Sequence, residues 1–89
     1  MPYIKQEQRD NLDPHIDALV KALPTENFAG DLNYAICRIA DGLLADTKNY
    51  ARLNEVIGAL ECAKLELYRR VASPYEDKKV TENGDVFES

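Results

Sequence analysis

Apolar positions spaced three and four residues apart predict three amphipathic helices along the chain. The first is expected over residues 14–23, after a helical turn or two in residues 3–12. Asp13 is its expected N-cap, because a residue before proline avoids the helical region and proline suits the first helical position. Pro24 ends this helix. Its single apolar face consists of Leu12, Ile16, Leu19, Val20 and Leu23.

The second helix has a break near its start. Thr25 is its candidate N-cap, and Gly30 interrupts the pattern, so the firm part covers residues 31–45. Residues 45–49 form a short polar connection, which favours antiparallel packing of the helices that it joins. The apolar stripe consists of Leu32, Ile36, Ile39 and Leu43, with Ala35 and Ala40 beside it and Cys37 and Leu44 widening it.

The third helix, expected over residues 49–71, carries a heptad seam with one polar member, Lys64. Three interpretations of Lys64 stay open. Its stem covers apolar neighbours while the ammonium group reaches water, or it pairs with Glu61, Asp41 or Asp31, or it fixes register and oligomer state. Pro74 is expected to end the helix. The seam consists of Leu53, Ile57, Leu60, Lys64, Leu67 and Val71.

A second, weaker stripe lies roughly opposite this seam and consists of Gly58, Cys62 and Leu65. Glycine in the middle of a helix costs about 0.5–1 kcal/mol relative to alanine, so a close neighbour is a sensible reason for its presence. Both faces of the helix are therefore expected to be occupied, one by the first helix and the other by a second subunit.

The last 17 residues differ in character, because they are charged and contain an Asn83-Gly84 pair typical of a type I′ turn. Residues 80–82 and 85–87 are expected to pair across that turn as a short β-hairpin. The sequence thus predicts an all-α domain over residues 1–72 with three helices. The second and third form an antiparallel hairpin, the first packs against it, and residues 73–89 are a C-terminal arm of the same domain.

Composition narrows the classes of function. The formal net charge is −5, which argues against binding to nucleic acid or to anionic membranes, since both need a basic face. No apolar run approaches the ~18 residues that span a bilayer, and the N-terminal residues lack the apolar core of a signal peptide. A cytoplasmic location is therefore expected. Cys37 and Cys62 are expected to be reduced, buried thiols.

Candidate chemistry is sparse, and no catalytic, cofactor-binding or metal-ligating residue is predicted. Glu55, Glu61 and Glu66 are spaced six and five residues apart and not three or four, as ligands on one helix face must be. Glu55 and Glu66 share a face but lie three turns apart, about 16 Å along the axis, so one ion cannot bridge them. His15, the only histidine, has no serine or acidic partner that would suggest a catalytic triad.

The stretch AGDLNYAICRIADGLL, residues 29–44, resembles part of the all-α nucleotide pyrophosphatases of the MazG type. In that family, acidic pairs spaced three residues apart hold magnesium, and Asp31 would match the last aspartate. Phe28 stands where the paired glutamate would be, and the chain contains no E-x-x-E pair. This resemblance implies an alternative function as a metal-dependent protein that binds or hydrolyses nucleotides.

A wider resemblance covers nearly the whole chain and includes PYI, GDLNYAI, NEVIGALECAKLELYRR, PYEDKK and NGDV. These segments resemble a small family of short bacterial and phage proteins with no assigned activity. The family supplies no catalytic residues.

The pattern favours a non-enzymatic helical module that self-associates, most simply as a dimer, or binds an unidentified protein partner. Its candidate interface or polar core residues are Gly58, Glu61, Cys62, Lys64 and Leu65.

Overall fold

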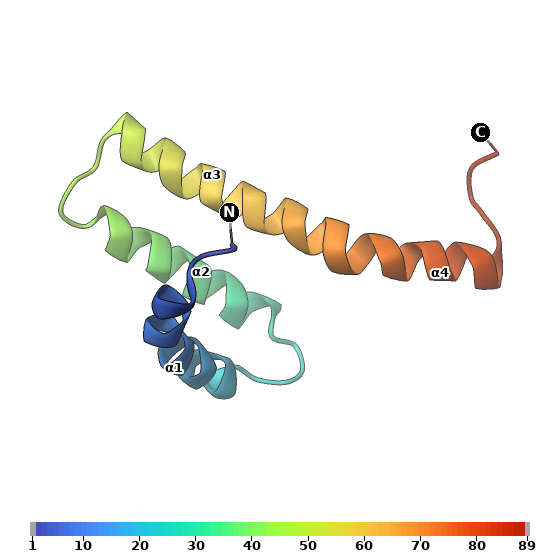
Figure 1. Cartoon of the computed structure of the whole chain (residues 1–89), viewed down its shortest axis with the longest axis horizontal. Coiled ribbons are helices and arrows are strands. Elements are labelled where there is room, and N and C mark those ends of the chain that lie inside the picture. Colours follow the sequence, from blue (N-terminus) through green and yellow to red (C-terminus); the bar gives the residue numbers. More distant parts are fainter. Residues whose placement is uncertain (1, 89) are drawn as a thin grey trace. The chain divides into compact units, whose positions relative to one another are not determined.

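The computed structural model describes residues 2–88, and every regular element in this range is helical (Figure 1), which confirms the all-α class. The helices are α1 (Gln6–Ala22), α2 (Ala29–Leu44), α3 (Tyr50–Leu67), a π-helical turn η1 (Tyr68–Ala72) and α4 (Ser73–Asn83). α3, η1 and α4 follow one another without a break, so the chain forms three continuous helical segments. Two compact units divide it after Val56, within α3. The proposed arrangement as one domain with an arm stays a prediction.

Helix α1 begins earlier than the sequence pattern indicated. Gln8 Oε1 accepts a hydrogen bond from the backbone N–H of Lys5 (3.0 Å), which satisfies one of the unpaired donors at the helix start. Pro14 then lies inside the helix. The prediction that Asp13 and Pro14 restart the chain is therefore wrong, because the cap at Lys5 already sets the helical direction for the residues that follow.

The start of α2 also differs from the prediction. Its N-cap is Phe28 and not Thr25, and the chain turns into the helix at Asn27, whose φ is 54°. Asparagine tolerates this left-handed conformation because its short polar side chain bonds locally. Gly30 lies in the first turn of the helix and does not interrupt it.

Helix α3 starts where the sequence predicted. Asn49 Oδ1 accepts a hydrogen bond from the backbone N–H of Arg52 (2.9 Å), the bond of a helix N-cap. The guanidinium group of Arg52 donates to the carbonyl oxygen of Leu43 and so connects the first turn of α3 to the end of α2. The antiparallel packing of the second and third helices along their whole length, with the first helix against them, stays a prediction.

The prediction that Pro74 ends this helix is wrong. Proline has no N–H to donate, and its ring collides with the carbonyl four residues earlier in an α-helix. The widened turn η1 relieves that collision. The backbone N–H of Ser73 donates to the carbonyl oxygen of Tyr68, five residues back, and Pro74 then lies in the first turn of α4, where an N–H is not needed.

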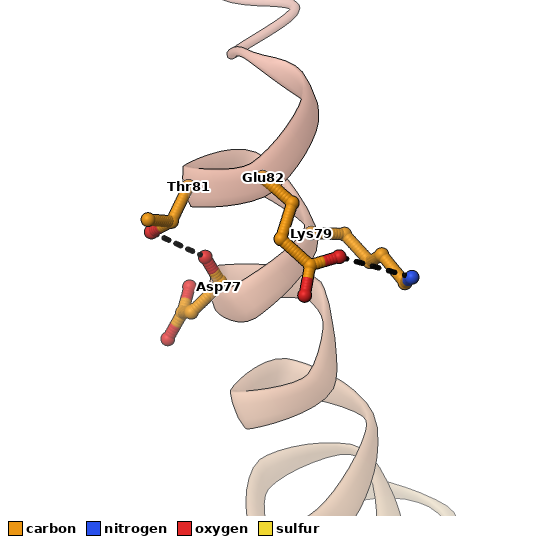
Figure 2. A network of polar contacts seen from close by, with 4 residues as sticks. All are labelled: Asp77, Lys79, Thr81 and Glu82. Atoms are coloured by element: carbon orange, nitrogen blue, oxygen red, sulfur yellow. Dashed lines mark hydrogen bonds and ion pairs between the residues drawn. The ribbon is translucent and has the colours of Figure 1, made fainter.

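The predicted β-hairpin is absent from residues 2–88, because most of the expected arm is helix α4. Asn83 ends this helix, and Gly84 follows with φ 92°, which glycine adopts without the steric penalty of a side chain. Within α4, Lys79 Nζ lies 3.2 Å from Glu82 Oε2, and Thr81 Oγ1 donates to the carbonyl oxygen of Asp77 (Figure 2). The Asn-Gly pair therefore closes a helix and forms no type I′ turn.

None of the side chains in the described range is buried. The most enclosed positions are only half-buried, and large apolar side chains are exposed on every α-helix. Both cysteine thiols are exposed as well, so the expectation of buried thiols is wrong for the single chain.

Candidate functional site

The apolar seam of α3 is exposed along the part that lies in the second unit. The exposed fractions are 62% for Ile57, 43% for Leu60 and 62% for Leu67. Single exposed apolar residues are ordinary on protein surfaces, but a continuous apolar stripe marks an interaction surface. We call this stripe, with Lys64 in its middle, the α3 seam: Ile57, Leu60, Lys64 and Leu67.

Lys64 is paired in the structure. Its Nζ lies 3.1 Å from Glu61 Oε1, and the two side chains are 70% and 53% exposed. Of the three interpretations of Lys64, the pairing with Glu61 is thus present in the single chain. An exposed pair three residues apart on a helix contributes only a few tenths of a kcal/mol. Helix stability alone is therefore a weak reason for a charge in the middle of an apolar stripe.

The opposite stripe of α3, with Gly58, Cys62 and Leu65, is equally open. Leu65 is 56% exposed, and a Cβ built on Gly58 would meet no atom within 4 Å. The close neighbour that would explain the glycine is therefore not supplied by the described residues of its own unit. The five candidate residues predicted from the sequence lie on one helix, and they divide between its two faces.

Sequence reasoning missed the turn η1, which follows the α3 seam directly. Tyr68 Oη donates a 2.6 Å hydrogen bond to Glu76 Oε1 across this turn. That hydrogen bond, together with the negative charge of Glu76, raises the pKa of the Tyr68 phenol. Single π-helical turns occur frequently at functional sites. The sequence signal for this turn is Pro74, three residues after Val71. A proline at this position indicates the end of a helix equally well.

A shallow groove lies between α1 and α2. It has a volume of about 580 Å³ and apolar walls that include Leu19, Leu23 and Ile39. Arg38 lies at its edge and donates a 3.0 Å hydrogen bond to Tyr34 Oη, which raises the pKa of the guanidinium group. The groove has one charge of each sign, from Asp31 and Arg38, and resembles a docking surface more than a catalytic pocket.

Neither a metal centre nor a membrane span can be identified. Within residues 2–88, no three histidine, cysteine, aspartate or glutamate side chains come together in a group that could hold a metal ion. No helix in the same range is both long and apolar enough to cross a bilayer. The alternative function, a metal-dependent protein that binds or hydrolyses nucleotides, stays a prediction.

Comparison with known proteins places the chain in a family. No curated protein and no solved structure matches the chain. The model of one protein family, described as "Domain of unknown function (DUF6899)", matches residues 1–86. This match includes α4, so the C-terminal residues are part of what defines the family. The chain therefore belongs to the DUF6899 family, a domain of unknown function.

Proposed function

We propose that this protein is a non-enzymatic helical module that works by self-association, most simply as a dimer formed through α3. The observation that carries the proposal is that neither compact unit, in the described residues 2–88, buries a side chain by itself, while apolar residues recur on α3 at a helical period. A folded chain of this size is expected to bury roughly 60–65% of the surface that its unfolded form exposes. A second copy supplies the missing contacts.

The energetics set the range of concentration in which the dimer should be observed. Fully burying a leucine, isoleucine or valine side chain is worth about 1.5–3 kcal/mol. Ile57, Leu60 and Leu67 are still about half exposed, so burial of these three side chains in both copies gains roughly 5–10 kcal/mol. Association costs at least about 4 kcal/mol. The remainder of up to about 6 kcal/mol corresponds to dissociation constants of tens of micromolar or weaker.

Sedimentation velocity over a concentration series, from about ten micromolar to about one millimolar, tests this proposal. We expect the mass to rise from that of one 10.0 kDa chain towards twice that value. The helical circular dichroism per residue should rise over the same series, because association stabilises the folded form by mass action. A constant single-chain mass with an unchanged helix signal would contradict self-association.

A further inference from the structure

The α3 seam has a pair of opposite charges at its centre, and these charges indicate how a second copy would lie on it. We propose that two copies of α3 pack antiparallel along the α3 seam, and that Glu61 of each copy pairs with Lys64 of the other. This inference rests on the proposed self-association and adds its orientation, its register and the residues that select it. The occupant of the exposed seam is thus a second copy of the same helix.

The register follows from the heptad positions. Ile57 and Lys64 occupy a positions and Leu60 and Leu67 occupy d positions, and in an antiparallel pair each a residue lies opposite a d residue. A register centred on residue 62 matches all four, with Ile57 against Leu67 and Leu60 against Lys64. A shift of one heptad in either direction pairs two of the four with residues outside the α3 seam, either Leu53 and Tyr50 or Val71 and Pro74. The register centred on residue 62 is therefore the one that uses the whole α3 seam.

This register also brings opposite charges together. Lys64 of one copy lies opposite Leu60 of the other, one residue away from Glu61, a rise of about 1.5 Å along the axis. The a and e positions are adjacent on the helix surface, and in an antiparallel pair the e positions of both helices lie on the same side of the interface. Glu61 of the second copy therefore lies on the same side as Lys64 of the first. Two copies therefore form a neutral cluster of two ammonium groups and two carboxylates. A parallel pair would instead place Lys64 against Lys64, and like charges in contact disfavour that arrangement.

In the single chain, the Glu61 carboxylate and the Lys64 ammonium group are both accessible to a second copy. Glu61 and Lys64 already lie 3.1 Å apart and are more than half exposed, so a second copy reaches both without breaking other contacts. The α-helical spacing needed for the heptad ends at Leu67, where η1 begins. All four residues of the α3 seam thus lie in regular α-helix, directly before η1.

Mixing two oppositely charged variants tests the contact between copies. Glu61→Lys makes the cluster wholly positive and Lys64→Glu makes it wholly negative, so each alone should weaken its own dimer about tenfold or more. Mixed together, with one chain isotope-labelled, they should form heterodimers at about nine-tenths of all dimers by native mass spectrometry, against a statistical half. The pairing within one helix cannot produce this preference, because neither variant regains it.

A second mixture tests the orientation. When wild type is mixed with Lys64→Glu, heterodimers should make up the statistical half of all dimers. An antiparallel heterodimer keeps one of the two Glu61–Lys64 contacts, which is the average of the two contacts in the wild-type homodimer and none in the variant homodimer. A parallel pair would favour this heterodimer strongly, because it replaces a Lys64–Lys64 contact by an attractive one. A strong preference for the heterodimer here would overturn the antiparallel register.

The matched control uses the pair Lys79–Glu82 on α4, which has the same three-residue spacing and a similar distance of 3.2 Å (Figure 2). Lys79→Glu mixed with Glu82→Lys should give the statistical half. The inference is overturned if wild type forms a dimer but the mixture of Glu61→Lys with Lys64→Glu gives the same fraction of heterodimer as the control mixture. A wild-type monomer at every concentration would instead overturn the proposed self-association itself.

Discussion

Tyr68 Oη donates a 2.6 Å hydrogen bond to Glu76 Oε1, and this bond crosses the π-helical turn that joins α3 to α4. The two residues are eight positions apart, on either side of Pro74. Because Pro74 removes one backbone donor at this point, the side-chain bond provides a connection that the backbone cannot make. The continuity of α3 and α4 therefore depends partly on a single phenol.

Replacing Tyr68 by phenylalanine should loosen α4 selectively. The change removes only the hydroxyl group and keeps the ring. We expect faster amide hydrogen exchange in residues 76–83 of Tyr68→Phe, with exchange in α1 and α2 unchanged, measured by mass spectrometry of peptide fragments. Tyr75→Phe is the control, because the Lys79 ammonium lies 5.5 Å from the centre of the Tyr75 ring and the phenylalanine ring keeps that contact. Equal exchange in both variants would show that the bond does not hold α4.

The same bond predicts a dependence on high pH. A raised pKa of Tyr68 means that the folded chain holds the phenolic proton more tightly than the unfolded chain does. The stabilising effect is full below the ordinary tyrosine pKa of about 10 and is lost as the pH rises through the raised pKa of Tyr68. The helix signal of α4 should therefore fall in this alkaline range.

Absorbance titration of tyrosinate checks that dependence. In the wild-type protein, Tyr68 should ionise in a late step, above the ordinary tyrosine pKa of about 10. Glu76→Ala should remove this late step, because it removes both the hydrogen bond and the charge that raise the pKa of Tyr68. Glu82→Ala is the control and should leave the titration unchanged. A late step that survives in Glu76→Ala would contradict the assignment.

The helical class and the positions of the helices could be predicted from the sequence because the apolar period of α2 and α3 extends over several turns. The boundaries at proline and glycine could not. Pro14, Gly30 and Pro74 are all strong stop signals, yet all three lie inside helical segments. Pro74 follows the widened turn η1, Gly30 keeps its backbone N–H in the first turn of α2, and Pro14 lies in the interior of the regular helix α1. A single sequence does not show which of these positions a helix accommodates.

The candidate site could be predicted only in part. The period of the seam and the polar exception at Lys64 are visible in the sequence, and so is the three-residue spacing to Glu61. Apolar periodicity shows which face of a helix is covered in the folded protein but not which segment covers it. Cys37 and Cys62 lie in predicted helices beside apolar positions and were therefore expected to be buried, but both are exposed in the single chain.

The two prolines inside helical segments should respond differently to substitution. Pro14 lies in the regular helix α1, where an interior proline costs about 3 kcal/mol relative to alanine. Pro74 lies beside η1, which already relieves the ring collision. We therefore expect Pro14→Ala to stabilise the folded chain by roughly 1–3 kcal/mol, and Pro74→Ala to stabilise it by less. Urea unfolding followed by circular dichroism measures both, and a larger gain for Pro74→Ala would contradict the role given to η1.

The reactivity of Cys62 distinguishes between the two faces of α3. In the antiparallel arrangement along the α3 seam, Cys62 lies on the outward face and stays exposed, as it is in the single chain. If the stripe with Gly58, Cys62 and Leu65 were the interface, association would cover the thiol. We therefore expect Cys62 to react with a thiol reagent at a rate that does not change with protein concentration across the dimerisation range.

The measurement needs a chain with one reactive thiol, so Cys37→Ser is made first. Its remaining thiol should label at nearly the same rate below and above the dissociation constant, and only a few times more slowly than in denaturant. Leu65→Ala is the matched variant, because it alters the opposite stripe and should leave dimerisation unchanged, whereas Leu60→Ala in the α3 seam should weaken it. If labelling of Cys62 slows about tenfold or more as the dimer forms, and Leu65→Ala weakens association, the interface lies on the face of Gly58, Cys62 and Leu65. The charges of Glu61 and Lys64 would then act only within one helix.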